Sequence, residues 1–236
     1  MGVLREELRH NLMEAGAVLV GFADLAGCGE LPYPALTRAV SYAVAINPRI
    51  VASIAEGPTL EYEEEYNRLN KLIGLLSEHA KACIRRYGFK AEGVPSTNNN
   101  YNEETLLAGF PHKTAAVMAG LGWIGKNDLL VTEQYGCAVR LGTVFTDATF
   151  PPVASMVSQC GSCNRCCVAC PASAPLGRNW EKGAGRENQV DIFACNRQLQ
   201  KWKEMRGLQH AICGICIANC TWTRKWLAAQ GYGLKG

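Results

Sequence analysis

The sequence predicts an α+β protein in which a larger lobe of helices around a mixed sheet precedes a small, cysteine-rich lobe. Two observations support this fold class. Over the first 150 residues, helical apolar spacing alternates with short buried-strand patterns. Nine of the twelve cysteines then fall between residues 160 and 220. The alternating pattern ends at 149–152, so we place the two domains at 1–150 and 151–236.

The first half of the larger lobe has clear periodicities. Apolar residues repeat at helical spacing up to Gly16, which predicts a helix near the N-terminus. The apolar runs 17–24 and 39–46 each predict a buried strand. A long helical pattern over 60–87 follows, and Gly88 is a typical residue to end it.

The second half of this lobe contains shorter elements. Residues 89–94 predict another strand, and the polar, asparagine-rich stretch 95–102 predicts a loop that could lie over a pocket. A helix is predicted over 112–119. The runs 129–132 and 138–146 predict two strands, joined as a hairpin through a Gln-Tyr-Gly turn.

Composition excludes several classes of protein. The formal net charge is only +3 and 48% of residues are apolar, so nothing demands a nucleic-acid or membrane partner. No stretch reaches the ~18 uninterrupted apolar residues of a membrane span, and the first residues predict an amphipathic helix rather than a cleavable leader. We therefore expect a soluble cytoplasmic protein of a reducing, anaerobic environment.

One cysteine run carries specific chemistry. Cys160, Cys163, Cys166 and Cys170, followed by Pro171, spell C-x2-C-x2-C-x3-C-P, the run that bacterial ferredoxins use to hold iron–sulfur clusters. Three thiolates at three-residue intervals on a curling loop can reach three corners of one cubane. The fourth cysteine normally ligates a different cluster, so the run implies two clusters.

Cysteines for the second cluster lie downstream. Cys213, Cys216 and Cys220 repeat the spacing at the end of the first run, and Cys195 stands between the two groups. By the ferredoxin crossing rule, one [4Fe-4S] cluster takes the first three cysteines of the run and the last downstream one, and the other takes the remaining four. The two predicted ligand sets are Cys160, Cys163, Cys166 and Cys220, and Cys170, Cys195, Cys213 and Cys216. The placement of Cys195 is the least constrained.

A pair of structural zinc sites is the alternative, because C-x2-C pairs also build zinc ribbons. A ribbon needs two such pairs and has no use for a third cysteine and a Cys-Pro at these offsets, so the pattern favours clusters. The other cysteines, Cys28, Cys83, Cys137 and Cys167, are interpreted as small buried apolar side chains.

A glycine motif lies in the larger lobe. Gly120, Gly122 and Gly125 satisfy G-x-G-x-x-G, but the dinucleotide fingerprint requires a strand before it and a helix after it. Here a predicted helix precedes the glycines and a predicted strand follows. We therefore interpret the motif as a turn whose glycines permit positive φ and close backbone approach.

These motifs together resemble a known family. The segments 119–127, 129–131 and 141–147, followed by the two cysteine groups, resemble epoxyqueuosine reductase and the iron–sulfur core of the corrinoid-dependent reductive dehalogenases over 110–222. The resemblance implies a first lobe related to corrinoid-processing and nitroreductase-like folds and a second, ferredoxin-like lobe with two [4Fe-4S] clusters. It also implies a bound cobalamin with its cobalt near one cluster.

The resemblance assigns the glycine turn to the corrinoid. Cofactor-binding residues on this view are Gly120, Gly122, Trp123, Gly125 and Lys126. Glycine backbone would lie close to the ring, and Lys126 would lie near its amide edge. A solvated surface lysine is the alternative for Lys126.

The chain departs from the family where an acid is expected. Epoxyqueuosine reductases carry an aspartate proton donor ahead of the glycine turn, whereas residues 94–97 read Val-Pro-Ser-Thr. His112 is the residue best suited to replace it, because an imidazole can donate a proton near neutral pH. A helix-capping or core histidine is the alternative. Glu103, Glu104 and Tyr101 are weaker candidates.

Two further departures concern the substrate. The family's Cys-Pro-Trp after the last ligand is here Cys220-Thr221-Trp222, and the chain stops at 236 without the helical-repeat extension of the tRNA-acting members. With the weak net charge, this argues against a nucleic-acid substrate.

The sequence thus predicts an iron–sulfur oxidoreductase. On the favoured hypothesis, electrons pass from a low-potential ferredoxin or flavodoxin type donor through two clusters to a bound cobalamin, which reduces a small substrate. The alternative is an electron-transfer or cobalamin-reducing carrier protein that serves a separate corrinoid enzyme and performs no substrate chemistry itself.

Overall fold

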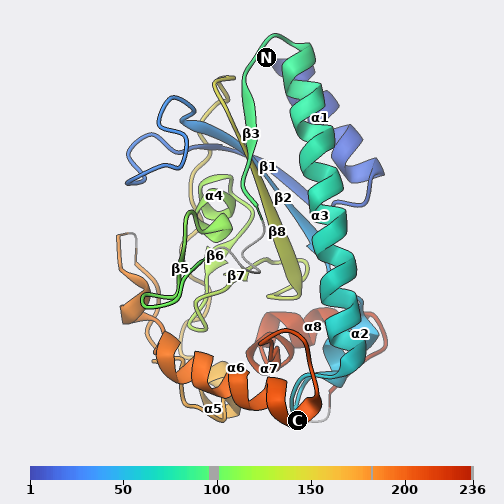
Figure 1. Ribbon diagram of the computed structural model, residues 1–236, viewed down its shortest axis with the longest axis vertical. Coiled ribbons are helices and arrows are strands. Elements are labelled where there is room, and N and C mark those ends of the chain that lie inside the picture. The colour runs from blue at the N-terminus through green and yellow to red at the C-terminus, as the bar shows by residue number, and fades with distance from the viewer. Residues whose placement is uncertain (96–100, 182, 235–236) are drawn as a thin grey trace. The chain divides into compact units, whose positions relative to one another are not determined.

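The computed structural model describes residues 1–95, 101–181 and 183–234 (Figure 1). The chain divides into two compact units, each built from three separate segments. The first, here called the sheet unit, contains Met1–Ala45, Leu69–Gly122 and Arg140–Met156. The second, here called the cysteine unit, contains Ile46–Arg68, Trp123–Val139 and Val157–Gly236.

A four-stranded sheet forms the centre of the sheet unit. Its strands are β1 (Leu19–Asp24), β2 (Arg38–Ala45), β8 (Val139–Thr146) and β3 (Ala91–Gly93), in that spatial order. The pairs β1–β2 and β3–β8 are antiparallel. Ile46 N–H, just after β2, donates to the Ala138 carbonyl, just before β8, so this pair is also antiparallel. The prediction of a mixed sheet was wrong, because each strand of this sheet runs antiparallel to its neighbours.

Helices cover both faces of this sheet. In α1 (Gly2–Glu14), leucines at helical spacing are buried, and the guanidinium groups of Arg5 and Arg9 lie over the ring of Phe22 in β1. The adjacent Gly21 points the other way: a Cβ there would meet the Ala119 carbonyl at 2.6 Å, at the end of α4 (His112–Met118). Because successive strand residues face opposite sides, α1 and α4 pack on opposite faces.

The long helix α3 (Leu60–Arg86) crosses from one unit to the other between Arg68 and Leu69. Within the sheet unit, the buried Tyr42 hydroxyl donates to the Ile73 carbonyl at 2.9 Å and so fixes α3 to β2. Burial raises the pKa of Tyr42 above its usual value. A small hairpin also belongs to this unit, formed by β4 (Tyr101–Asn102) and β5 (Leu107–Ala108).

The cysteine unit consists mainly of short helices. These are α2 (Pro48–Ser53), α5 (Arg165–Ala169), a 3₁₀ turn at Arg186–Asn188, α6 (Ile192–Arg206), α7 (Ile215–Ala218) and α8 (Thr221–Ala229). Its hairpin pairs β6 (Trp123–Ile124) with β7 (Leu130–Val131). The predicted hairpin between 129–132 and 138–146 was therefore wrong, because β7 pairs with the preceding strand β6 and β8 joins the four-stranded sheet.

Most other predicted elements are confirmed within a few residues: the N-terminal helix, the strands near 17–24, 39–46 and 89–94, and the helices near 60–87 and 112–119. Part of the predicted loop 95–102, residues 96–100, lies outside the described residues. No helix in the described ranges has the length and apolar character that a bilayer crossing requires.

The division predicted at 1–150 and 151–236 differs from the two units. The last boundary falls after Met156, and the segments 46–68 and 123–139 belong to the cysteine unit. Long-range hydrogen bonds explain why the segment 46–68 belongs to the cysteine unit. Asn219 Nδ2 donates to the Ala55 carbonyl at 3.0 Å, and His210 N–H donates to buried Glu63 at 2.6 Å.

Candidate functional site

Four cysteines of the cysteine unit line one cavity of about 170 Å³. They come from the loop before α5, from α5 and from the residue that precedes α8. These four are Cys160, Cys163, Cys166 and Cys220, the set that the crossing rule assigns to one cluster. The other lining residues include Lys126, Asn127, Thr221, Trp222 and Lys225. Residues separated by some sixty positions are thus brought to one space, as a shared cluster requires.

Local backbone geometry explains how the first three reach the cavity. Gly161 has φ +51°, in the left-handed region, and Cys163 N–H then bonds back to the Cys160 carbonyl at 3.0 Å. The chain curls into α5, which carries Cys166. At the end of α5, Cys170 takes an extended conformation, φ −77° and ψ 116°, and leaves the helix.

The remaining four predicted ligands interact with one another. Cys195, in α6, lies within electrostatic range of Cys170 and Cys213. Cys216, in α7, interacts with Cys213, Cys195 and Cys170, and also with Cys166 of the first set. Cys195, the predicted ligand that the sequence constrained least, thus interacts electrostatically with two other members of its predicted set.

Burial makes several of these sulfurs poor thiolates without a nearby positive charge. It raises the pKa of the Cys166 thiol to about 12 and that of Cys195 to about 11, and it also raises the pKa of Cys213. Neighbouring sulfurs raise the pKa of Cys195 further. Iron supplies the positive charge that a buried thiolate set needs, so the donor chemistry fits clusters.

The pKa of Cys220 is shifted in the opposite direction. A hydrogen bond from the Cys137 thiol lowers its pKa to about 6, against the opposing effect of burial. Backbone N–H groups of Trp222 and Thr223, at the start of α8, add to this effect, as does the Thr223 hydroxyl. Several donors thus converge on this one sulfur.

In the described part of the chain, no three histidine, cysteine, aspartate or glutamate side chains converge closely enough to hold a single metal ion. Glu103 and Glu104, the weaker acid candidates, are exposed between β4 and β5.

Helix α4 precedes the glycine turn and β7 follows it, the order that the sequence predicted, while the short strand β6 lies between Gly122 and Gly125. In the sheet unit, Gly120 has φ +71°, and a Cβ there would meet Val153 Cγ1 at 2.7 Å. Gly122 ends that segment and is buried. In the cysteine unit, a Cβ on Gly125 would meet Val131 Cγ2 at 2.7 Å. Gly120 and Gly125 therefore allow close packing against protein side chains.

The two other residues predicted at the corrinoid are buried. Lys126 is 7% exposed and lines the cavity of the four cysteines, so the alternative of a solvated surface lysine was wrong. Trp123 is fully buried and packs edge-to-face on Trp222, with ring centroids 5.1 Å apart. Its indole N–H has no hydrogen-bond partner in the described part of the chain.

His112 begins α4 but does not cap it with its side chain. Its Nδ1 lies 3.0 Å from Thr143 Oγ1, in β8. Burial lowers the pKa of His112 to about 4, and the positive charge of Arg140 contributes to this shift. The ring is therefore neutral near pH 7, which weakens it as the proton donor that the sequence suggested.

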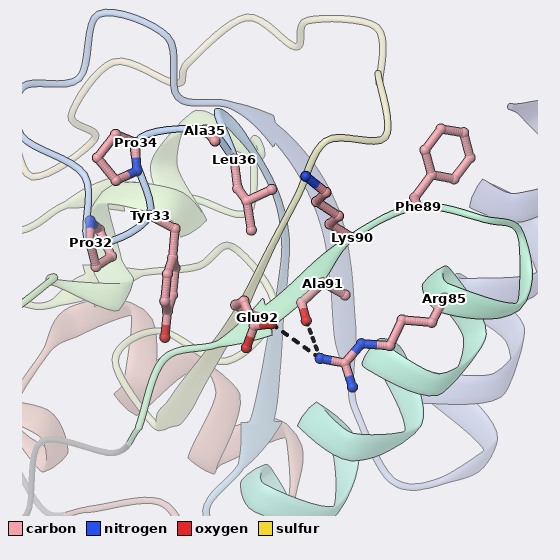
Figure 2. Close-up of a pocket in the computed structure, with 10 residues that line it drawn as sticks. All are labelled: Pro32, Tyr33, Pro34, Ala35, Leu36, Arg85, Phe89, Lys90, Ala91 and Glu92. Carbon is pink, nitrogen blue, oxygen red and sulfur yellow. Dashed lines mark hydrogen bonds and ion pairs between the residues drawn. The ribbon is translucent and has the colours of Figure 1, made fainter.

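The sheet unit holds two further cavities. The larger, about 520 Å³, is lined by the loop 32–36 and by residues around β3 (Figure 2). Arg85 donates to the Ala91 carbonyl at 2.6 Å and to Glu92 at 3.3 Å. Tyr33 also lines the second cavity, about 240 Å³, with Phe110. Pro95, the first residue of the stretch that the sequence placed over a pocket, also lines the second cavity.

The fold of this chain is shared by a class of proteins with solved structures. It is similar to a reductive dehalogenase described with a mechanism for B12-dependent dehalogenation, with TM-score 0.72 and 18% identity over 93% of this chain and 32% of that one. It is also similar to an epoxyqueuosine reductase bound to a tRNA stem loop, with TM-score 0.63 and 19% identity over 98% of this chain and 67% of that one.

Sequence comparison narrows the class: the chain is homologous to the epoxyqueuosine reductases. The enzyme of Lactococcus garvieae is 35% identical over 168 residues, 68% of this chain and 46% of the relative. That of Listeria monocytogenes is 48% identical over 114 residues, 46% of this chain and 28% of the relative. The matches thus span less than half of these relatives. No model of a known protein family matches the chain. The resemblance predicted from the motifs is confirmed.

Proposed function

We propose that this chain is an iron–sulfur reductase that holds two [4Fe-4S] clusters and a cobalamin and acts on a small substrate. The observation that carries the proposal is the cavity shared by Cys160, Cys163, Cys166 and Cys220. Their spacing matches the ferredoxin run, and the homology to epoxyqueuosine reductases supports the reductase class.

Each residue set has its own part. The first four cysteines hold one cluster, and Cys170, Cys195, Cys213 and Cys216 hold the other. When bound, the clusters supply one-electron transfer and the corrinoid supplies a strongly reducing cobalt. Cys216 of the second set interacts electrostatically with Cys166 of the first set, which suits stepwise electron transfer between the two clusters.

Trp222 and Lys126 line the cavity of the four cysteines. Trp123 and Trp222 pack against each other, and the unpartnered indole N–H of Trp123 suits a bound group with acceptor atoms. The buried ammonium of Lys126 offers a positive charge to the same space. The cobalamin assignment rests on the class of relatives, one of which is described with B12-dependent dehalogenation.

The proposed substrate class and electron donor are inferred from the charge of the chain and from the proposed redox chemistry. We infer a small-molecule substrate, because the net charge of +3 gives no basis for binding a nucleic acid. The reducing equivalents come from a low-potential donor of the ferredoxin or flavodoxin type.

One observation favours the second candidate, an electron-transfer or cobalamin-reducing protein that serves a separate corrinoid enzyme. His112, the proposed replacement for the family's acid, is neutral near pH 7 because burial lowers its pKa to about 4. A carrier needs no substrate acid.

Anaerobic reconstitution tests the proposal. With iron and sulfide, the chain should bind about eight irons, the content of two cubanes, and should then take up about one equivalent of cobalamin with a shift in the corrinoid absorbance. Zinc in place of iron would overturn the cluster assignment, and an unchanged corrinoid spectrum would overturn the cobalamin assignment alone.

A separate assay distinguishes enzyme from carrier. With a chemical reductant, the enzyme turns over a halogenated phenol or an epoxide with no second protein present. His112→Gln should leave cluster reduction unchanged and lower that turnover. A carrier shows no such turnover and reduces cobalamin held by another protein.

A further inference from the structure

The sulfur atoms around the cavity receive hydrogen bonds from side chains that have no other assigned role. Cys163 Sγ lies 3.1 Å from the hydroxyl of Thr221, the first residue of α8. Thr221 directly follows Cys220, the last predicted ligand, at the position where the family has proline. Its hydroxyl therefore points at a predicted cluster ligand.

The direction of this hydrogen bond follows from iron chemistry. Either atom could donate when the cysteine carries a proton. A cysteine that ligates iron is a thiolate and has no proton to give. In the cluster-bound protein, the Thr221 O–H must therefore donate to Cys163.

A second donor approaches the same ligand set from another segment. The side chain of Cys137, 2% exposed, hydrogen-bonds Cys220. By the same reasoning, its S–H donates once Cys220 ligates iron. The Cys137 sulfur also accepts a hydrogen bond from Asn127 Nδ2 at 3.3 Å, and its backbone N–H donates to Thr223 Oγ1 at 2.9 Å. Cys137 is thus held in place on both sides.

Hydrogen bonds to cluster sulfurs change the reduction potential. A donor withdraws electron density from the thiolate and stabilises the reduced cluster, which carries one more negative charge. Such donors around a metal centre orient the ligands and tune the metal. Two donors on two of four ligands should therefore raise the potential of this cluster specifically.

We propose that Thr221 and Cys137 are positioning residues that raise the reduction potential of the cluster held by Cys160, Cys163, Cys166 and Cys220. This inference rests on the proposed function, because it requires that cluster. The raised reduction potential makes this cluster a better electron acceptor than its four ligands alone would make it. Electrons from the other cluster therefore collect on it.

The test is an anaerobic potentiometric titration of the reconstituted protein, followed by electron paramagnetic resonance. Thr221→Val removes the hydroxyl and keeps the volume, and Thr221→Ser restores it. In Thr221→Val, the ratio of reduced to oxidised cluster at a fixed potential should fall about tenfold for one cluster, equivalent to about 59 mV for a one-electron couple. The other cluster should be unchanged, and Thr221→Ser should match the wild type.

Cys137→Ala tests the same cluster from a different segment and keeps the inference testable if Thr221→Val fails to assemble. It should lower the potential of the same cluster as Thr221→Val, whereas Cys137→Ser, which keeps a donor, should restore most of it. Unchanged potentials in a variant with about eight irons would overturn the inference, as would an equal shift of both clusters. A wild type that binds no iron would instead overturn the proposed function itself.

Discussion

Asn127 donates a hydrogen bond from its side-chain amide to the backbone carbonyl of Cys216, 3.4 Å away and 89 positions along the chain. The same amide donates to Cys137. Asn127 is 7% exposed, so its amide is satisfied inside the protein rather than by water. The segment after the glycine turn is therefore tied to helix α7, which carries Cys216 of the second cysteine group.

Asn127→Leu should destabilise the reconstituted protein by about 1–3 kcal/mol, because buried partners lose their donor. Urea unfolding under anaerobic conditions measures this. Asn11→Ala is the control, since the Asn11 side-chain amide donates to Glu7 one helical turn away at 3.4 Å, and the effect of this substitution should be within about 0.5 kcal/mol. Equal effects of the two variants would contradict the role given to Asn127.

Gly136→Ala should be far more harmful than Gly231→Ala. Both glycines have positive φ, +57° and +82°, so each substitution strains the backbone by about 1 kcal/mol. A Cβ on Gly136 would also clash with the backbone of Thr223 in α8, whereas Gly231 has open space around it. We expect Gly136→Ala to lose iron, by displacing Cys220, while Gly231→Ala keeps about eight irons. Iron analysis of both variants decides the point.

Stability should fall in acid because of His112. Its folded pKa, about 4, is below the usual 6.5, so the unfolded chain binds more protons between these values and stability rises with pH across that window. The full difference is about 3 kcal/mol, lost as the pH falls from 6.5 to 4. His112→Gln should remove this part of the pH dependence and leave stability near pH 7.5 less affected. If urea unfolding of His112→Gln gives the same dependence of stability on pH between 4 and 6.5 as the wild type, the His112 ring is accessible to protons in the folded protein.

Lys126→Met should lower the potential of the cluster in the cavity, because a buried positive charge favours the form with one more electron. Lys225 also lines the cavity but is exposed, with its ammonium 4.6 Å from the Trp222 ring centroid. Solvent screens that charge, so Lys225→Met should have a smaller effect. Redox titration of the two variants compares them directly, and a larger shift in Lys225→Met would reverse this assignment.

Cys195→Ser should reduce the iron content from about eight to about four, as expected for loss of one cluster. Cys167→Ser should keep both clusters, although Cys167 adjoins a predicted ligand in the chain. If instead Cys167→Ser loses iron and Cys195→Ser does not, the second ligand set is misassigned.

Sequence patterns predicted the helices and most strands because the periodicity of apolar residues is a local property. The partner of β7 was not predictable in this way: its two paired residues, Leu130 and Val131, carry no side-chain signal that chooses β6 over β8. The ligand sets followed from spacing, since a cluster imposes its geometry on nearby residues. The contact of Cys137 with the start of α8 spans 86 positions and left no trace in the pattern.

Because the cysteine unit is built from three chain segments, it cannot be transferred to another protein as one continuous fragment. A fragment that begins at Val157 contains all eight predicted ligands but lacks Ala55, Glu63 and Asn127, which bond to its loops. It would have to fold without these partners. Unlike a ferredoxin module, which a single cut could transplant into a new host, the cysteine unit is built from three separate segments of its chain, so duplication or fusion must carry all three together.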